Sequence, residues 1–394
     1  MKNQLFLLVF ILLPLVVSAE KVEIDGIFYN LNTDAQTAEV TYGSQAYVGD
    51  IVIPASITVD DVVYNVTSIG EEAFAYCSNL TSVNISNNVT NIGKGAFESC
   101  SSLTSINIPN SITTIEKKTF SGCHKLTFID IPNSVTSIRE KAFQDCFLLT
   151  SVNLPNSVTS IEDEAFTNCG LTSFTFGNSV TSIGRGVFDG CYHLTTIEIP
   201  DNWTTIGNGV FRNCGLISVN IPNNITEIGD NAFRTCTSLI AINITNSVTK
   251  IGNEAFGNCS SLASIVIPNS TKKIGRYAFN CCFSLTNVYC YAEEVPVTDS
   301  HVFNDINSEN AILHVPAASI EAYSNANQWK DFGSIVALTD EDPKPTTGIM
   351  ATTARQQPTI VERYTIDGKR IVTPQRGLNI IKMSDGTMKK VVVK

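Results

Sequence analysis

Charged residues are scarce in this chain of 394 residues. They make up 16% of it, whereas about a quarter is usual for a soluble protein. The 37 Asp and Glu outnumber the 26 Lys and Arg, which gives a net charge of −11. A chain with this balance is poorly suited to bind the phosphate backbone of a nucleic acid. We therefore expect no nucleic acid among its partners.

The patterns of common active sites are also missing. The four His, which are His124, His193, His301 and His314, are scattered, and no two stand at the spacing of a metal site. No G-x-S-x-G, H-E-x-x-H or phosphate-loop pattern occurs, and Cys281-Cys282 lacks the C-x-x-C spacing. We predict that the protein is not an enzyme, and that it uses no cofactor and no metal.

Long apolar runs are absent beyond the first 19 residues, so we expect no membrane span in the mature chain. Residues 1–19 combine a Lys at the second position, an apolar run from Leu5 to Val17 and small residues at the end. This is the layout of a secretory signal peptide. A retained membrane anchor is the weaker alternative, because a spanning helix needs ~20 apolar residues. We expect an extracellular or outer cell-surface protein.

What the chain does contain is a repeat. A Phe recurs at intervals of 22 or 23 residues, and a Cys follows each of these Phe three residues later. The column consists of Phe74, Phe97, Phe120, Phe143, Phe166, Phe188, Phe211, Phe233, Phe256 and Phe279. A constant period of this length is typical of a solenoid, in which each coil buries its apolar face against its neighbours.

Each repeat predicts two extended pieces and a turn. In the stretch from Leu103 to Pro109, Ile106 and Ile108 alternate with polar residues, as in a strand with one buried face. Pro109 suits the end of that strand. A second extended piece, residues 111–115, leads into an A-F-x-x-C segment, for which we expect a short helical turn whose apolar side chains point inward. Burying one Phe contributes about 1.5–3 kcal/mol, so the Phe column supplies much of the stability.

Ten of the twelve Cys belong to one column on the inward side of this turn. We interpret them as buried free thiols that act as small apolar side chains. Disulfides are the alternative, because a spacing near 5 Å between adjacent coils lies within disulfide range. The parallel direction of the side chains makes such bridges awkward. We expect Cys290 in the core, and Cys281 to point outward as the one candidate for reactivity or a bridge.

The pattern L-T-S-[VI]-x-I-P-N-S-V-T-S-I-G-x-x-A-F-x-x-C resembles the BspA-like, or Treponema-type, leucine-rich repeats of bacterial surface proteins over about residues 66–290. The resemblance implies a right-handed leucine-rich repeat solenoid with a parallel β-sheet face, export from the cell, and adhesion or other protein binding. Glu116, Arg139 and Glu162 replace the Gly after Ile in three successive units. We infer that this position does not need a positive φ, and that three charges lie side by side on one edge.

The repeat divides the chain into predicted domains. They are the signal peptide (1–19), an N-terminal β cap (20–65), ten repeat units of 22–23 residues (66–290), a C-terminal cap with a strand and a short helix (291–338), a linker (339–358) and a small β module (359–394). The last segment resembles the C-terminal sorting domains of type IX secretion in Gram-negative anaerobes. A small β module of unrelated purpose is the alternative.

The outward positions of the predicted strands are mostly Ser and Asn, so exceptions are candidates for partner contact. They are Phe128, Asp130, Glu198, Val266 and Tyr289, with Trp203 just beyond the strand of its unit. Exposed aromatic residues are typical interface anchors, although drift on a tolerant surface would give the same pattern. We interpret the protein as a monomer whose sheet face binds a host or bacterial surface protein or glycan. The alternative is a structural or spacer protein of the bacterial envelope without a specific ligand.

Overall fold

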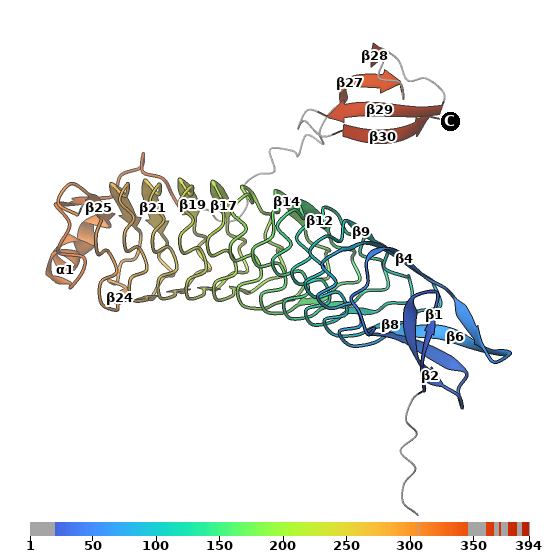
Figure 1. The fold of residues 1–394 in the computed structure, drawn as a ribbon. Coiled ribbons are helices and arrows are strands. Elements are labelled where there is room, and N and C mark those ends of the chain that lie inside the picture. The colour runs from blue at the N-terminus through green and yellow to red at the C-terminus, as the bar shows by residue number, and fades with distance from the viewer. Residues whose placement is uncertain are drawn as a thin grey trace, which may run out of the picture. The chain divides into compact units, whose positions relative to one another are not determined.

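The computed structural model describes residues 20–306, 308–345, 360–365, 370–371, 377–383 and 388–393. The predicted signal peptide and residues 346–358 of the predicted linker lie outside the described residues. The chain forms two compact units, Met1–Pro345 and Thr346–Lys394. The first unit is a stack of coils (Figure 1), in which successive repeats lie on top of one another.

The stack begins with strands that are not part of the repeat. These are β1 (Glu20–Ile24), β2 (Ile27–Asn32), β3 (Thr37–Thr41), β4 (Gly49–Ile53), β5 (Ser56–Val59) and β6 (Val62–Ile69). Buried and less buried residues alternate along β2, as the alternating sequence predicts. Five of them form one sheet in the order β1-β2-β3-β6-β5, whereas β4 pairs in parallel with the first strand of the repeat.

Each coil of the repeat contributes to two columns of parallel strands. The first column contains β4, β7 (Leu80–Ile85), β9 (Ser105–Ile106), β12 (Ser151–Asn153), β14 (Ser173–Thr175), β17 (Ser218–Asn220), β19 (Ala241–Asn243), β21 (Ser264–Ile267), β23 (Asn287–Cys290), β25 (Ile312–Val315) and β26 (Ser334–Ala337). It corresponds to the L-T-S-[VI] piece of the repeat. Its inward residues, such as Val152 and Val219, are buried.

The second column corresponds to the extended piece before the turn. It contains β6, β8 (Asn91–Ile92), β10 (Thr114–Ile115), β11 (Ser137–Ile138), β13 (Ser160–Ile161), β15 (Ser182–Ile183), β16 (Thr205–Ile206), β18 (Glu227–Ile228), β20 (Lys250–Ile251), β22 (Lys273–Ile274) and β24 (Val297–Thr298). Equivalent residues pair across coils, as Ile138 does with Ile161. The predicted solenoid is confirmed.

The Phe column runs through the centre of the stack. All ten predicted rings are fully buried, and adjacent rings are stacked face to face. The column is one coil longer than the sequence indicated, because the Phe303 ring stacks on the Phe279 ring at 5.5 Å. At the other end the Tyr47 ring packs on the Phe74 ring at 4.6 Å. The coils therefore extend beyond residues 66–290 in both directions.

The turns that carry the Phe column are tight turns rather than helices. Within one turn the N–H of Cys100 donates to the carbonyl of Phe97 at 3.2 Å, and between turns the N–H of Phe97 donates to the carbonyl of Thr119 at 2.9 Å. The Gly after Ile has no positive φ, as predicted from its replacement in three units. Its role is steric, because a Cβ on Gly93 would lie 2.5 Å from the backbone nitrogen of Glu71 in the preceding coil.

The lower end of the stack is closed by aromatic side chains. The predicted strand and short helix are present as β25, the 3-10 helix η1 (Ala317–Ser319) and α1 (Ile320–Asn325). Trp329 and Phe332 pack edge-on against the Phe303 ring, at 5.2 and 5.0 Å. These contacts cover the apolar end that the last coil would otherwise expose.

The second compact unit is a small antiparallel sheet. Its strands are β27 (Ile360–Thr365), β28 (Arg370–Ile371), β29 (Gly377–Met383) and β30 (Met388–Val393), in the order β28-β27-β29-β30. Among the described residues of the whole chain, no helix is long and apolar enough to cross a membrane.

Candidate partner-binding face

The first strand column is broken at two places. Its strands pair as β4-β7-β9, then β12-β14, then β17-β19-β21-β23-β25-β26. The coils in between, at residues 127–131 and 195–199, contribute no strand. The backbone of residues 128–131 makes no hydrogen bond to any part of the chain that the structure describes. Both breaks coincide with the coils that depart from the Ser and Asn pattern, at Phe128, Asp130 and Glu198.

The breaks lie beside the widest steps of the Phe column. Adjacent Phe rings are 5.7 Å apart between Phe97 and Phe120, and 6.0 Å apart between Phe166 and Phe188. The step from Phe188 to Phe211 is 5.7 Å. Elsewhere in the column the steps range from 5.1 to 5.5 Å. Wider steps weaken the ladder of backbone hydrogen bonds, because these bonds need a fixed strand spacing.

An aromatic wedge in the core accounts for the second break. The Phe174 ring lies 5.2 Å from the Phe166 ring and 4.7 Å from the Phe188 ring, so it spans the widest step. The Phe176 ring packs edge-on against Trp203 at 5.1 Å. Other coils hold aliphatic residues at these inward positions, such as Val152 and Leu154. The larger rings separate the coils.

The prediction of Trp203 as a surface residue is therefore wrong. Its side chain is 2% exposed, and its indole N–H donates to the carbonyl of Val180 at 3.1 Å. Trp203 follows Val180 by one full repeat, so it occupies the column of inward aliphatic residues in the second extended piece. It stabilises the core and offers nothing to a partner.

An acidic residue stands at the first break. In the preceding coil, the side-chain oxygen of Asn107 accepts a hydrogen bond from the N–H of Ile85 at 2.7 Å, and its NH₂ donates to the Ile85 carbonyl at 2.8 Å. This amide clamps two coils together. Asp130 stands one repeat later. A carboxylate has no N–H to donate, so Asp130 cannot form the same clamp to Ile108.

A hollow of about 350 Å³ opens at this place. It is lined by Asn107, Ile108, Asn110, Asp130, Ile131, Pro132 and Asn133. Phe128 stands two residues before Asp130, on the same side of the extended chain, and its side chain is 58% exposed. Asp130 thus lines the hollow, and Phe128 stands close to it in the chain without lining it. Glu198, also exposed, lies at the other break.

The two remaining predicted residues are not freely exposed. Val266 is only 6% exposed, because β21 runs between Asn243 of β19 and Tyr289 of β23, and the prediction of a surface residue is wrong. Tyr289 is half-buried, and its ring lies 4.4 Å from that of His314. Burial, with a smaller effect of the nearby Asp342 carboxylate, raises the pKa of the Tyr289 hydroxyl.

Residues that follow β26 in the chain cover the end of the first strand column near Tyr289. The Asp342 carboxylate lies 3.7 Å from Nδ1 of His314, and the Tyr291 hydroxyl donates to the carbonyl of Pro343 at 3.2 Å. Both Asp342 and Pro343 belong to the segment predicted as the start of the linker. The end of the face near Tyr289 is therefore less accessible than the first break.

Comparison with known proteins decides the family. The family model described as the BspA type leucine rich repeat region (6 copies) matches residues 55–172, 113–240 and 226–330. The chain belongs to the BspA-type leucine-rich repeat family. The matched range reaches beyond residues 66–290 at both ends, in agreement with the additional coils.

Solved structures with similar folds come from several bacteria. A leucine-rich repeat protein from Bacteroides ovatus is 26% identical, with 81% of this chain and 100% of that chain covered and a TM-score of 0.48. A leucine rich cell surface protein from Faecalibacterium prausnitzii is 26% identical, with 82% and 96% covered and a TM-score of 0.47. The T. pallidum leucine rich repeat protein is 24% identical, with 62% and 91% covered and a TM-score of 0.36. No curated protein matches the chain.

The Cys column of this BspA-type protein consists of buried free thiols, as interpreted from the sequence. Each thiol from Cys100 onward in the column lies within hydrogen-bond distance of the carbonyl of a Phe in the preceding coil, as Cys100 does with Phe74 at 3.0 Å. Burial raises the pKa of the Cys191 thiol to about 12. Cys290 is buried against the Tyr323 hydroxyl at 3.1 Å, as predicted. These thiols stay protonated and serve the core.

Cys281 is the least buried thiol of the described residues, and it is not paired with another Cys. Partial burial, together with the Asp305 carboxylate, raises its pKa above the usual value. A raised pKa lowers the fraction of reactive thiolate. The raised pKa therefore does not favour the reactivity that its sequence position suggested.

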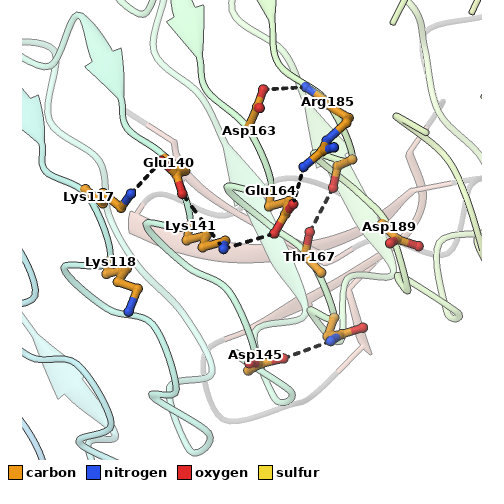
Figure 2. A network of polar contacts seen from close by, with 12 residues as sticks. Lys117, Lys118, Glu140, Lys141, Asp145, Asp163, Glu164, Thr167, Arg185 and Asp189 are labelled. Carbon is orange, nitrogen blue, oxygen red and sulfur yellow. Dashed lines mark hydrogen bonds and ion pairs between the residues drawn. The ribbon is translucent and has the colours of Figure 1, made fainter. Parts of the chain in front are cut away.

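The charged edge is a structural feature of the BspA-type coils. Arg139 pairs with Glu162 at 2.5 Å. Figure 2 shows the network that continues beside this pair, in which Lys141 lies 3.4 Å from Glu164 and Arg185 lies 3.1 Å from the same Glu164. Each cation is matched by an acidic residue of an adjacent coil. Such exposed pairs contribute about 0–1 kcal/mol each.

One group of exposed side chains was not predicted from the sequence. His124, Phe147, Tyr192 and Phe283 all stand directly after a column Cys, at the outer end of the turn, and all are exposed. The His124 and Phe147 rings are stacked at 4.8 Å. The other coils have Ser, Thr or Gly at this position, so the same search for departures would have found them. Within the described residues, no three His, Cys, Asp or Glu side chains gather as metal ligands.

Proposed function

We propose that this chain is a non-enzymatic binding protein, secreted or held on the outer surface of a bacterium. Its first strand column attaches it to a protein or glycan on a host or neighbouring cell. Phe128 and Asp130 support this proposal. An exposed aromatic ring and a carboxylate stand together on a rigid stack whose other outward residues are mostly Ser and Asn. Exposed aromatic residues on a rigid element are typical binding anchors.

Family membership supports the surface location. BspA-type leucine-rich repeats present extended surfaces that suit protein binding, and one similar structure is that of a leucine rich cell surface protein. The signal-peptide layout of residues 1–19 supports export. We further propose that the small sheet of β27 to β30 is a sorting module for type IX secretion, because its sequence resembles such domains.

The binding role is tested with the purified chain on immobilised extracellular-matrix proteins and on cultured epithelial cells. We expect saturable binding that Phe128→Ala/Asp130→Ala weakens by at least ~10-fold, the loss expected for two anchor residues. Ser218→Ala/Asn220→Ala, at the equivalent positions of β17, is the matched control and should bind as the parent does. A folded Phe128→Ala/Asp130→Ala variant that binds as well as the parent would show that this site is wrong.

The same experiment also tests the alternative, a structural or spacer protein without a specific ligand. If the intact chain binds neither the matrix proteins nor the cells, the adhesive function fails and the structural alternative stands. Mass measurement of the mature protein from culture medium and from the cell surface tests both export segments. Loss of residues 1–19 supports the signal peptide, and loss of the C-terminal module supports its role in sorting.

A further inference from the structure

We propose that the hollow at the first break of the strand column binds carbohydrate, and that it takes a single neutral pyranose ring. This inference rests on the proposed function, since it names the ligand class for one part of the face. The hollow of about 350 Å³ lies at the small end of the range of ~300–1,000 Å³ that small-molecule sites occupy. Its size suits one sugar ring of a glycan rather than a long segment.

The polar groups of the hollow are available for a ligand. The Asp130 carboxylate and the amides of Asn110 and Asn133 are exposed, and they make no hydrogen bond to the part of the chain that the structure describes. A carboxylate only accepts hydrogen bonds, whereas an amide both donates and accepts. Sugar hydroxyl groups also do both, so adjacent hydroxyls can donate to Asp130 and exchange hydrogen bonds with the amides.

The backbone adds further polar groups. Because residues 128–131 are not part of the strand ladder, their N–H and carbonyl groups have no partner within the described chain. In the coils that form strands the ladder uses such groups, as in β17 and β19. The break therefore places polar backbone beside the hollow, where a hydroxyl-rich ligand can satisfy it.

The apolar parts of the site match the other side of a sugar ring. Ile108, Ile131 and Pro132 form part of the lining. Phe128 does not line the hollow, but it stands two residues before Asp130, about 7 Å away along the extended chain. Its exposed ring offers a flat apolar face, and the C–H groups of a pyranose ring can pack on it. A metal ion fits less well, because the hollow has one carboxylate and divalent cations are usually held by several oxygen ligands.

Asp130→Asn is a sharp test because it removes the negative charge and replaces one acceptor oxygen with an NH₂ donor, while the side chain keeps its shape. The new amide can clamp to Ile108 as Asn107 clamps to Ile85, so the substitution should narrow the hollow. Phe128→Ala removes the exposed aromatic ring two residues before Asp130. Asp201→Asn is the control, since it removes one exposed carboxylate outside the hollow.

The experiment uses the full chain and a panel of glucose, galactose, mannose, N-acetylglucosamine and fucose, measured by saturation-transfer NMR and titration. We expect at least one sugar to bind, with a Kd that Asp130→Asn and Phe128→Ala each raise by ~10-fold or more. Asp201→Asn should leave the Kd unchanged within about twofold. If no sugar of the panel binds the parent, or if Asp130→Asn binds as tightly as the parent, the inference is overturned.

The sugar-binding experiment can fail independently of the adhesive function, and the two failures give different results. Sugar binding that depends on Asp130 supports the inference even if the chain binds no matrix protein or cell. Binding to matrix proteins or cells without binding to any sugar of the panel overturns the inference and leaves the adhesive function standing.

Discussion

Asn107 and Asp130 occupy the same position in adjacent coils, yet only Asn107 bridges to the coil before it. The oxygen of the Asn107 amide accepts a hydrogen bond from the N–H of Ile85 at 2.7 Å, and its nitrogen donates one to the Ile85 carbonyl at 2.8 Å. Asp130 makes no such contact with Ile108, and the hollow opens between these two coils. The first break in the strand column thus coincides with the replacement of the Asn107 amide by the Asp130 carboxylate.

This relationship predicts that Asp130→Asn stabilises the protein. Two hydrogen bonds to the backbone of Ile108 would form, each worth about 0.5–1.5 kcal/mol. We expect the free energy of unfolding in urea to rise by ~1 kcal/mol, and hydrogen exchange at Ile108 to slow. Asn107→Asp is the reverse variant, and it should lower the free energy of unfolding. An Asp130→Asn protein that is less stable than the parent would contradict the role assigned to this amide.

The Phe column leads to a prediction about stability. Replacing a Phe by Ala should lower the unfolding free energy more in the middle of the stack than near its end. Phe166 contacts the rings of Phe143, Phe174 and Phe188, whereas Phe74 contacts those of Tyr47 and Phe97. Phe166→Ala should therefore cost ~3–5 kcal/mol of unfolding free energy. Phe74→Ala, near the end of the stack, should cost less. Urea unfolding of both variants checks the order, and equal costs would mean that the ring stack is not cooperative.

The fold could be predicted from the sequence because the same local signal occurs in every coil. Alternating Ile residues, a Pro at the end of the strand and an inward Phe all indicate the same coil. A prediction is secure when local sequence signals and the overall fold agree in this way. The coil at Phe303 was missed because its interval from Phe279 is longer and Ile306 replaces the column Cys. A solenoid tolerates this change, since Ile306 fills the same buried place.

The site could be predicted only in part. Phe128 and Asp130 were found because they depart from a column of Ser and Asn. The break and the hollow were not predicted, because they depend on the spacing and the backbone hydrogen bonds between adjacent coils. The surface position predicted for Trp203 was wrong. Trp203 follows Val180 by one repeat, and this spacing indicates a buried replacement for Val rather than a surface anchor. Val266 was misplaced because neighbouring side chains cover it.

The corrected place of Trp203 gives a prediction of its own. Trp203→Val restores the residue type of its column but leaves space beside Phe176 and removes the hydrogen bond to Val180. We expect a loss of about 2–4 kcal/mol in unfolding free energy. Binding to matrix proteins or cells, measured well below the melting temperature, should not change. If Trp203→Val leaves the unfolding free energy unchanged but weakens binding, Trp203 contacts the partner and the core role assigned to it is wrong.

The buried thiols predict a loss of stability at alkaline pH. Burial raises the pKa of Cys191, Cys236 and Cys282 to about 12 in the folded chain, whereas an unfolded Cys titrates near ~8.5. Below pH ~8.5 both states hold the proton, so the stabilising effect is fully present. Above it only the unfolded state releases protons, and the unfolding free energy falls by up to ~1.4 kcal/mol per thiol and pH unit until the folded pKa is reached.

Urea unfolding between pH 7 and pH 9.5 measures this slope. The range stays below the usual pKa of Tyr and Lys, so the thiols dominate the change. Cys191→Ala/Cys236→Ala removes two of the titrating groups and should make the pH dependence shallower, although the variant starts from a lower stability. The folded parent should also resist alkylation by iodoacetamide at pH 8, because the thiolate is the reacting form. Rapid alkylation of the folded chain at the column Cys, together with an unfolding free energy that does not change with pH, would mean that these side chains are not held in a closed core.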